Sequence, residues 1–247
     1  MLSEKEQFQE DLLESARKMR SGQNSMLISS TFKQKGYITL KEMLAPERLG
    51  IIEAVLDATT TNSRQMLQFG WCKDLAHEIR RQLVAKGLIQ IDYAAVLCTC
   101  FEKSTEHNWL VAYHQDLSIP VKFKVEHPAL GGWSEKDGVF FVQPPDETLA
   151  QLVALRLHID ECGQEDGALK VIPGSHRAGR LNEPDKARLR EATEEVLCPV
   201  AKGAGMAMSP LLLHASSKAS GSSRRRVLHF LFGPPALPYG LEWASPD

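Results

Sequence analysis

His114 and Asp116 have the residue types and the spacing that a metal site requires. They stand two residues apart in YHQD, and residues two apart on a strand point to the same face, about 6–7 Å apart at the backbone. A third potential ligand, His214, ends the apolar run MSPLLLH. Two imidazoles and one carboxylate can hold a divalent ion and leave other coordination positions open. These residues therefore predict a metal site formed by His114, Asp116 and His214.

A second pair with the same spacing occurs later in the chain. His158 and Asp160 are also separated by one residue, so spacing alone does not choose between the two pairs. A buried histidine and aspartate can equally serve the fold by forming hydrogen bonds, because buried polar groups are usually satisfied in this way. On these residues alone, both pairs remain candidate metal ligands.

Arg225 is placed to bind an anion beside the expected metal site. It follows His214 by eleven residues in SSRRRVLHFLF. On a strand, Arg225 and His229 would share one face and Arg226 would lie on the other. A buried guanidinium needs an anion, and a carboxylate that accepts two parallel hydrogen bonds matches it best. We therefore expect Arg225 to point into the interior and Arg226 to point outward.

Three further polar residues near these motifs each have a functional and a structural interpretation. His229 could orient Arg225 or be a hydrogen-bonded core imidazole. Lys103 precedes the first pair and is either a solvated strand end or an anion contact. His176 lies in PGSH, a sequence more typical of a turn than of a metal ligand.

The cysteines indicate reduced thiols. The chain has five, an odd number, and no C-x-x-C pair, which argues against a disulfide framework and fits a cytoplasmic protein. Cys98 and Cys100 would share one face of a strand. We interpret them as strand core rather than as metal ligands.

The composition is that of a globular protein. The chain has 247 residues, of which 43% are hydrophobic and 24% charged, with a formal net charge of −2. This length suits a single domain spanning residues 1–247. The charge does not favour a nucleic-acid partner, and neither a signal peptide nor an apolar run of about 20 residues is present. We expect a cytoplasmic monomer or homodimer that acts on a small molecule and does not bind a membrane.

The expected elements form a helical part followed by a run of strands. Residues 1–93 should support the fold with helices, and residues 94–235 should form a β core with an insertion at 120–150 that acts as a lid or pocket wall. The expected helices are 3–20 (ended by the polar stretch SGQNS), 45–58 and 72–87, and residues 182–196 should form a helix or an ordered insertion between strands. The expected strand segments are 36–40, 94–103, 110–125, 149–160, 168–176, 205–217 and 225–233. This order predicts an α+β, mainly β, fold.

The segment from His114 to Phe232 resembles the phytanoyl-CoA dioxygenase family. The matching stretches are YHQD (113–116), DGALKVIPGSH (166–176) and LLLHASSKASGSSRRRV (211–227), and GYITLKEMLAPERL (36–49) and FEKSTEHNW (101–109) are similar to the family as well. The combination is more specific than any single motif, and it covers most of the chain. The resemblance implies a double-stranded β-helix, a jelly-roll and cupin-like core of about eight strands, with N-terminal and flanking helices.

The resemblance also assigns the metal ligands and the co-substrate. It implies that His114, Asp116 and His214 bind Fe(II), which favours this pair over His158 and Asp160. The second pair is then interpreted as a structural hydrogen-bonding pair. The co-substrates implied are 2-oxoglutarate and O2, with ascorbate in support.

Five further residues are expected around the co-substrate by the same resemblance. Arg225 matches the family's salt-bridge partner for 2-oxoglutarate, and Ser216 matches the hydroxyl that assists it. Gln115 and Thr99 fall where the family makes further co-substrate contacts. Arg156 stands where some members have Trp, so it could instead bind the 1-carboxylate of 2-oxoglutarate or an anionic substrate.

The activity implied is hydroxylation of an unactivated C–H bond in a small organic substrate, with release of succinate and CO2. Two other classes stay open. One is a non-catalytic β-barrel binding module, against which the retained ligands and Arg225 count. The other is a zinc-type metal hydrolase, for which the sequence offers no obvious general base and no use for Arg225.

Overall fold

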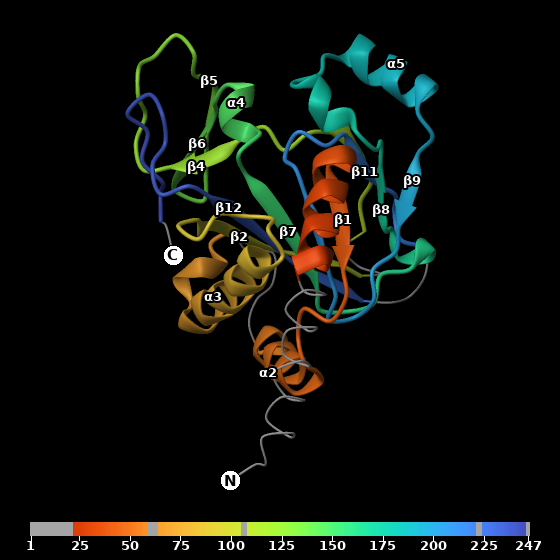
Figure 1. The fold of residues 1–247 in the computed structure, drawn as a ribbon. Coiled ribbons are helices and arrows are strands. Elements are labelled where there is room, and N and C mark those ends of the chain that lie inside the picture. Colours follow the sequence, from red (N-terminus) through yellow and green to blue (C-terminus); the bar gives the residue numbers. More distant parts are fainter. Residues whose placement is uncertain (1–21, 59–63, 105–107, 221–223, 246–247) are drawn as a thin grey trace, which may run out of the picture.

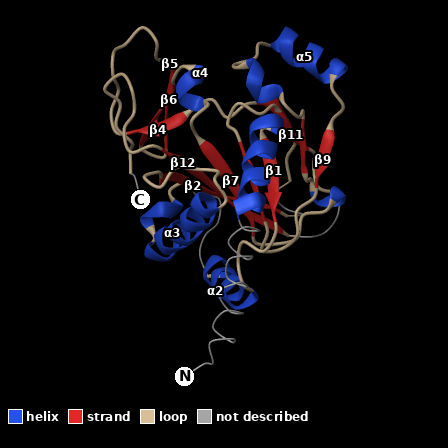
Figure 2. Ribbon diagram, in the orientation of Figure 1, coloured by secondary structure: helices blue, strands red, loops and turns tan. Residues whose placement is uncertain are grey.

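The computed structural model describes residues 22–58, 64–104, 108–220 and 224–245. Strands form the centre of this part of the protein, and most of the helices lie around its outside (Figure 1, Figure 2). Within the described residues, no helix is both long and apolar enough to cross a membrane. The helix expected at residues 3–20 lies outside the described residues.

A five-stranded antiparallel sheet forms the larger half of the core. Its strand order is β1-β10-β7-β12-β2. The strands are β1 (Tyr37–Leu40), β10 (Gly205–Met208), β7 (Val153–His158), β12 (Arg225–Gly233) and β2 (Ala94–Lys103). The sequence predicted β2 and β12 with these same bounds, because both are long uninterrupted runs of strand-forming residues.

A four-stranded sheet forms the smaller half. Its order is β3-β11-β8-β9, and all neighbours are antiparallel. The strands are β3 (Val111–His114), β11 (His214–Ser216), β8 (Leu169–Val171) and β9 (Val196–Cys198). The two sheets are the two halves of a double-stranded β-helix, which confirms the predicted fold class.

Two expected strands are divided in the structure. Residues 110–125 form β3 and a separate β4 (Ile119–Val121), because the chain leaves the small sheet after His114 and the Asp116 N–H donates to Pro210 O at 2.8 Å. Residues 205–217 form β10 and β11 in different sheets. Pro210 lacks an N–H for a ladder, and a turn closed by Leu212 N donating to Ser209 O at 3.0 Å separates the two strands.

The insertion at 120–150 contains a small sheet of its own. β4 pairs with β6 (Val139–Gln143), which pairs with β5 (Gly131–Lys136), and a short helix, α4 (Asp146–Leu149), follows. Asp137 and Gly138 join β5 to β6 with φ values of 52° and 77°. Positive φ at both turn residues matches the twist of a two-residue hairpin. This sheet lies beside the C-terminal segment, with Val121 bridged to Trp243 (Figure 1).

The helices follow the expected order with altered ends. They are residues 22–35, α2 (Pro46–Asp57), α3 (Gly70–Ala85) and α5 (Glu183–Ala192), with 3-10 turns at η1 (Met66–Gln68), η2 (Gln164–Asp166) and η3 (Ser175–Ala178). The polar stretch SGQNS was predicted to end a helix, but residues 22–25 are helical. Helix α5 was predicted to reach residue 196. It stops earlier because Thr193 is extended, and Val196 pairs with Val171 instead.

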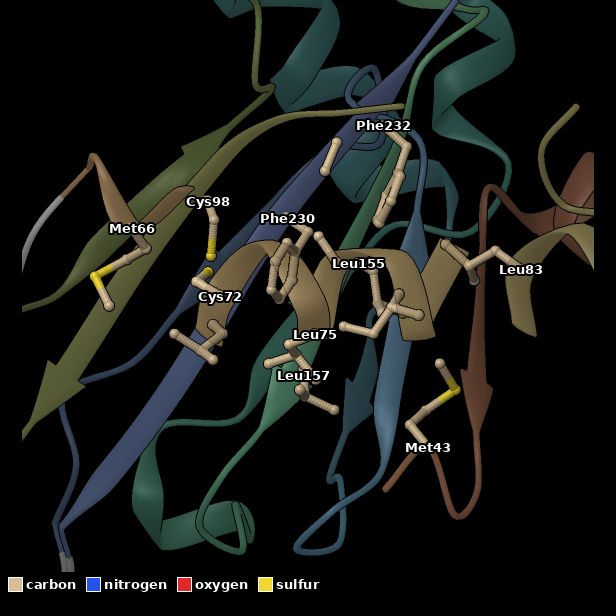
Figure 3. Packing of buried hydrophobic residues seen from close by; sticks show 14 of the residues in the cluster. Met43, Met66, Cys72, Leu75, Leu83, Cys98, Leu155, Leu157, Phe230 and Phe232 are labelled. Carbon is tan, nitrogen blue, oxygen red and sulfur yellow. The ribbon is translucent and has the colours of Figure 1, made fainter. Parts of the chain in front are cut away.

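The outer face of the large sheet is covered by helices. Side chains of β12 and β7, such as Phe230 and Leu157, pack with Leu75 of α3 in a buried cluster (Figure 3). Cys98 and Cys100 belong to the same cluster and are fully buried. The prediction that they are strand core is thereby confirmed.

The inner face of the same sheet has a different composition. Alternation along β12 puts Arg225 and His229 on the face opposite Phe230. Register places Lys103 beside Arg225, and places Arg156 beside His229. The large sheet therefore presents several polar side chains to the space between the two sheets.

Candidate functional site

His114, Asp116 and His214 come together at one end of the small sheet. One ligand atom from each lies within 4.8 Å of the others, and this is the one such group among the described residues. His114 ends β3 and His214 begins β11, where they are direct cross-strand partners with ring centroids 4.2 Å apart. The structure thus brings together the three residues that the sequence selected as metal ligands.

Both imidazoles are oriented for metal binding by the backbone. His114 Nδ1 lies 2.9 Å from Ala112 O, and His214 Nδ1 lies 2.9 Å from Leu212 O. A carbonyl accepts only from a protonated nitrogen, so Nδ1 carries the hydrogen, and in the neutral ring Nε2 keeps a free lone pair. The two Nε2 atoms lie 3.6 and 3.9 Å from the Asp116 carboxylate. Three donor atoms therefore converge on one point, which fits a divalent ion.

The protonation states of the cluster also suit metal binding. Burial raises the pKa of Asp116, but the neighbouring His214 and His114 outweigh it and hold the pKa well below its usual range. Burial lowers the pKa of His214 to about 4, although Asp116 opposes this. At neutral pH the site therefore offers an ionised carboxylate and a neutral buried imidazole, the forms that bind metals.

A cavity of about 190 Å³ extends from these three candidate ligands between the two sheets. Both sheets contribute to its wall. Its lining residues are Phe101, Lys103, Trp109, Val111, His114, Asp116, Arg156, Leu169, His214, Ser216, Arg225 and His229. Of these described residues, three carry fixed or near-fixed positive charge and one, Asp116, is a carboxylate.

Arg225 points into this cavity as the sequence predicted. It is 3% exposed, and its Nη1 donates to Gly167 O at 2.6 Å. Its Nε is buried without a hydrogen-bond partner among the described residues. A buried guanidinium with an unused donor is costly. Arg225 is therefore ready to bind an anion inside the cavity.

Ser216 supports the same end of the cavity. Its hydroxyl donates to Gly167 O at 2.8 Å, so Ser216 and Arg225 share one acceptor. Gly167 adopts φ +71°, and a Cβ there would lie 2.5 Å from Ser217 O. Glycine is required at this position, because both the backbone conformation and the close approach exclude a side chain.

Lys103 is the second cation at this end of the cavity. It is 1% exposed, and its ammonium donates to Ser216 Oγ at 2.9 Å and to Ser217 O at 2.7 Å. Burial, with Arg225 and Arg156 nearby, lowers the pKa of Lys103 to about 8. The interpretation as a solvated strand end is therefore wrong, since Lys103 is buried beside Arg225.

Arg156 and His229 lie between Arg225 and the metal ligands. Arg156 Nη1 is 3.4 Å from His229 Nδ1, and the guanidinium carbon is 5.8 Å from the centroid of Phe101. Burial and the charge of Arg225 lower the pKa of Arg156 to about 10, and its Nε has no partner among the described residues. His229 Nε2 lies 3.9 Å from Asp116. His229 thus contacts Arg156 and Asp116, which fits the interpretation as a hydrogen-bonded core imidazole rather than as a residue that orients Arg225.

Two expected co-substrate residues lie outside this cavity. Gln115 donates both amide hydrogens to backbone carbonyls, at Gly179 O (2.8 Å) and Leu211 O (2.7 Å), and accepts from Leu181 N at 2.9 Å. These bonds tie the loops that contain Gly179, Leu181 and Leu211 to the segment between His114 and Asp116. Thr99 is buried beside His229 but lines an adjacent cavity.

The second H-x-D pair is not a pair in the structure. Asp160 accepts from Arg226 Nε and Nη2, both at 2.8 Å, and from the Arg226 backbone N–H at 2.7 Å. His158 Nδ1 is buried without a partner among the described residues. The expected hydrogen bond between His158 and Asp160 is therefore wrong, because the chain leaves β7 after His158 and Asp160 turns to the outer side of the sheet.

Arg226 lies on the face opposite Arg225, as alternation requires, but it does not reach solvent. It is 5% exposed and pairs with Asp160 and with Asp57 of α2, the latter at 2.7 Å. Arg226 does point to the outer face of the sheet, as predicted. It is nevertheless buried, because helix α2 covers that face.

Sequence reasoning missed the apolar wall of the cavity. Phe101, Trp109, Val111 and Leu169 line it. Phe101 could have been found, because it lies two residues from Lys103 on the same strand face. The other three come from segments whose relation to the site depends on how the two sheets face each other. His176 lies in the turn η3, as expected.

The fold is a double-stranded β-helix, and its site offers two histidines and one carboxylate that could hold a divalent metal ion. The sequence profile of the phytanoyl-CoA dioxygenase family (PhyH) matches residues 32–227. The chain therefore belongs to this family. Among curated proteins, none matches the chain.

Several solved structures share the fold at low sequence identity. The epimerase SnoN, in complex with Fe3+, alpha ketoglutarate and nogalamycin RO, is 14% identical, with 87% of each chain covered and a TM-score of 0.65. EctD from S. alaskensis in its apoform is 17% identical, with 87% of this chain and 80% of that chain covered and a TM-score of 0.60. HygX from Streptomyces hygroscopicus, with nickel and 2-oxoglutarate bound, is 12% identical, with 82% and 84% covered and a TM-score of 0.57. These similarities establish the shared fold.

Proposed function

We propose that the protein is an Fe(II)- and 2-oxoglutarate-dependent dioxygenase that hydroxylates an unactivated C–H bond of a small organic substrate. One observation carries this proposal. A three-ligand metal site and a buried guanidinium with an unused donor line the same cavity. Such a pairing suits a co-substrate that binds a metal at one end and an arginine at the other.

The metal would be held by His114 Nε2, His214 Nε2 and the Asp116 carboxylate. This donor set leaves coordination positions open and is typical of non-haem Fe(II) oxygenases. When bound, iron and 2-oxoglutarate supply the oxidation: O2 gives one oxygen atom to succinate and one to the substrate, and CO2 leaves. Residues of this chain orient the reactants and exclude water. SnoN and HygX, with their bound metal and keto acid, support the assignment by analogy.

The charge of the cavity supports a dicarboxylate as the co-substrate. Lys103, Arg156 and Arg225 contribute three positive charges, and Asp116 contributes one negative charge. The difference, three minus one, is two positive charges before a metal binds. 2-Oxoglutarate carries two negative charges, so it offsets this excess and satisfies buried donors.

Individual contacts follow from where each cation lies. We assign the distal carboxylate to Arg225, with Lys103 and Ser216 beside it, because these three share one corner of the cavity. Arg156 lies nearer the ligands and faces the other carboxylate end. Thr99 and Gln115 keep supporting roles outside this cavity.

The two other classes fit less well. A zinc hydrolase needs a general base, and among the described residues Asp116, itself a ligand, is the one carboxylate in the cavity. A non-catalytic binding module leaves the converging Nε2 atoms and the unused Arg225 donor without a purpose. We still predict that the protein acts on one small molecule and that it is a monomer or a homodimer.

Succinate release is the decisive experiment. Purified protein is incubated with Fe(II), ascorbate, O2 and 2-oxoglutarate, and succinate is measured against the His214→Ala variant and against zinc-loaded protein. We expect succinate above both controls, even without substrate, through slow uncoupled turnover. Equal succinate in all three samples, together with no binding of 2-oxoglutarate to the metal-loaded protein, would contradict the proposal.

A further inference from the structure

A second cavity adjoins the metal site from the side opposite Arg225. It has a volume of about 260 Å³ and shares three lining residues, Phe101, Asp116 and His229, with the first cavity. The residues that line it alone are Leu97, Thr99, Gln115, Leu117, Ser118, Ile119, Lys136, Phe141, Leu152, Pro210 and Leu231. A molecule in this space would lie against Asp116, on the other side from the co-substrate cavity.

The second cavity is mainly apolar. Seven of the eleven residues that line it alone are Leu, Ile, Phe or Pro. Its size is close to the lower end of ligand pockets, roughly 300–1,000 Å³, in which a largely apolar wall and a few polar groups set orientation. Such a wall favours a compact apolar body, such as a short alkyl chain or one ring.

Lys136 is the one cation lining this cavity among the described residues. It ends β5, directly before the Asp137–Gly138 turn, and its ammonium lies 5.2 Å from the centroid of the Phe141 ring. The turn is anchored, because Asp137 Oδ2 accepts from Arg64 at 3.1 Å and Asp137 O accepts from the Gln65 side chain. The hairpin therefore holds Lys136 at a fixed place on the wall.

We propose that the second cavity binds the organic substrate, and that this substrate is a compact apolar molecule with one anionic group bound by Lys136. The proposal rests on the proposed function, because it takes the metal site as the reacting centre. The first cavity cannot serve both reactants: at about 190 Å³, with three cations on its wall, it suits the dicarboxylate. The inserted sheet would then supply substrate specificity.

Charge supports an anionic substrate in addition to Lys136. The three cations, the Asp116 carboxylate and a divalent metal ion together give the first cavity a net charge of four positive units (three minus one plus two). The dicarboxylate offsets two of them, and His229 and Phe101 are shared with the second cavity. An anion entering beside them meets a field that remains positive.

Lys124 provides a matched control for Lys136. Its ammonium lies 5.2 Å from the Phe140 ring, the same distance that separates Lys136 from Phe141. Both lysines are exposed and both belong to the insertion. Lys124 does not line the second cavity. Lys124→Gln therefore removes the same charge and the same ring contact without touching the proposed site.

Binding is tested by calorimetry on protein loaded with Mn(II) and saturated with 2-oxoglutarate under anaerobic conditions. The probes are hexanoate and 3-phenylpropanoate, their neutral amides, and hexyl phosphate. We expect both acids to bind more tightly than their amides. Lys136→Gln should weaken the acids about five- to tenfold, as for the loss of one ordinary hydrogen bond at an exposed side chain, and leave the amides unchanged. Hexyl phosphate tells whether the anion is a carboxylate or a phosphate.

A second variant tests the location. Ser118 is half-buried and lines only the second cavity. Ser118→Phe should abolish binding of acids and amides alike while the affinity for 2-oxoglutarate stays within twofold.

The possible results separate the two proposals. Three results would overturn the substrate assignment alone. The acids and amides could bind equally, or Lys124→Gln could weaken binding as much as Lys136→Gln. The third result is that no probe binds to a protein that still binds metal and 2-oxoglutarate. Failure to bind 2-oxoglutarate at all would overturn the proposed function and this inference with it.

Discussion

Arg225→Ala should weaken the binding of 2-oxoglutarate by about 30- to 300-fold. The guanidinium is 3% exposed, one of its donors is unused, and it lines the cavity that contains the metal ligands. Removing one partner of a buried, hydrogen-bonded charge pair costs about 2–5 kcal/mol, or roughly 30- to several-thousand-fold in affinity. Lys103 is the direct cross-strand neighbour of Arg225 and remains in the variant. Its charge should keep the loss in the lower part of that range.

Two companion variants make this prediction specific. Arg225→Lys should recover part of the affinity, because an ammonium supplies charge but not two parallel hydrogen bonds. Arg226→Ala lies on the opposite face of β12 and should leave 2-oxoglutarate affinity within about twofold. The contrast between adjacent arginines isolates the cavity contact from the general effect of losing a positive charge.

The assay measures the dissociation constant for 2-oxoglutarate by calorimetry on Mn(II)-loaded protein, and the apparent KM by succinate release with iron saturating. Circular dichroism confirms that each variant is folded. Equal and small effects at Arg225 and Arg226 would refute the assignment of the distal carboxylate to Arg225. An exchange of the two phenotypes would instead mean that the strand register is shifted by one residue.

Three further predictions follow from the same structure. His114→Ala should abolish metal binding and succinate release, whereas His158→Ala should leave metal affinity unchanged; the opposite result in equilibrium dialysis would reverse the choice between the two H-x-D pairs. Arg226→Ala should lower the free energy of unfolding by about 2–4 kcal/mol and Tm by about 5–15 °C, because the Asp160 carboxylate loses both side-chain hydrogen bonds from Arg226. A melting curve like that of the wild type would contradict this. Lys103, with its pKa lowered to about 8, loses its charge as pH rises through 8, so 2-oxoglutarate affinity should fall by up to about tenfold per pH unit above that value; Lys103→Met should remove this pH dependence while retaining the fold.

The second H-x-D pair shows where sequence spacing stops being informative. His158 and Asp160 have the same spacing as His114 and Asp116. In both cases the aspartate lies beyond the end of its strand, so strand alternation does not decide its direction. Asp116 is held toward the histidines after its N–H bonds to Pro210 O, whereas Asp160 is drawn outward by Arg226. Partners distant in sequence made the difference.

Gln115 and Lys103 illustrate the same limit. Gln115 lies between two candidate metal ligands in sequence, yet its amide bonds to backbone carbonyls of distant loops. The sequence alone allowed Lys103 to be either solvated or buried. It is buried against the end of β11, where Ser216 Oγ and the carbonyl of the following Ser217 accept its hydrogens. Whether a polar residue is buried depends on the segments that pack against it, and these segments come from distant parts of the chain.

The sequence by itself selected the candidate ligands His114, Asp116 and His214, and it predicted the strands β2 and β12 and the inward direction of Arg225. These features depend on residue type and on the two-residue period of a strand, which are local properties. Only the tertiary structure decided that His229 contacts Arg156 rather than Arg225, that helix α2 covers Arg226, and that the insertion is a sheet which puts Lys136 on a second cavity. Each depends on the packing of segments far apart in the chain, and that packing is set by the whole core rather than by local pattern.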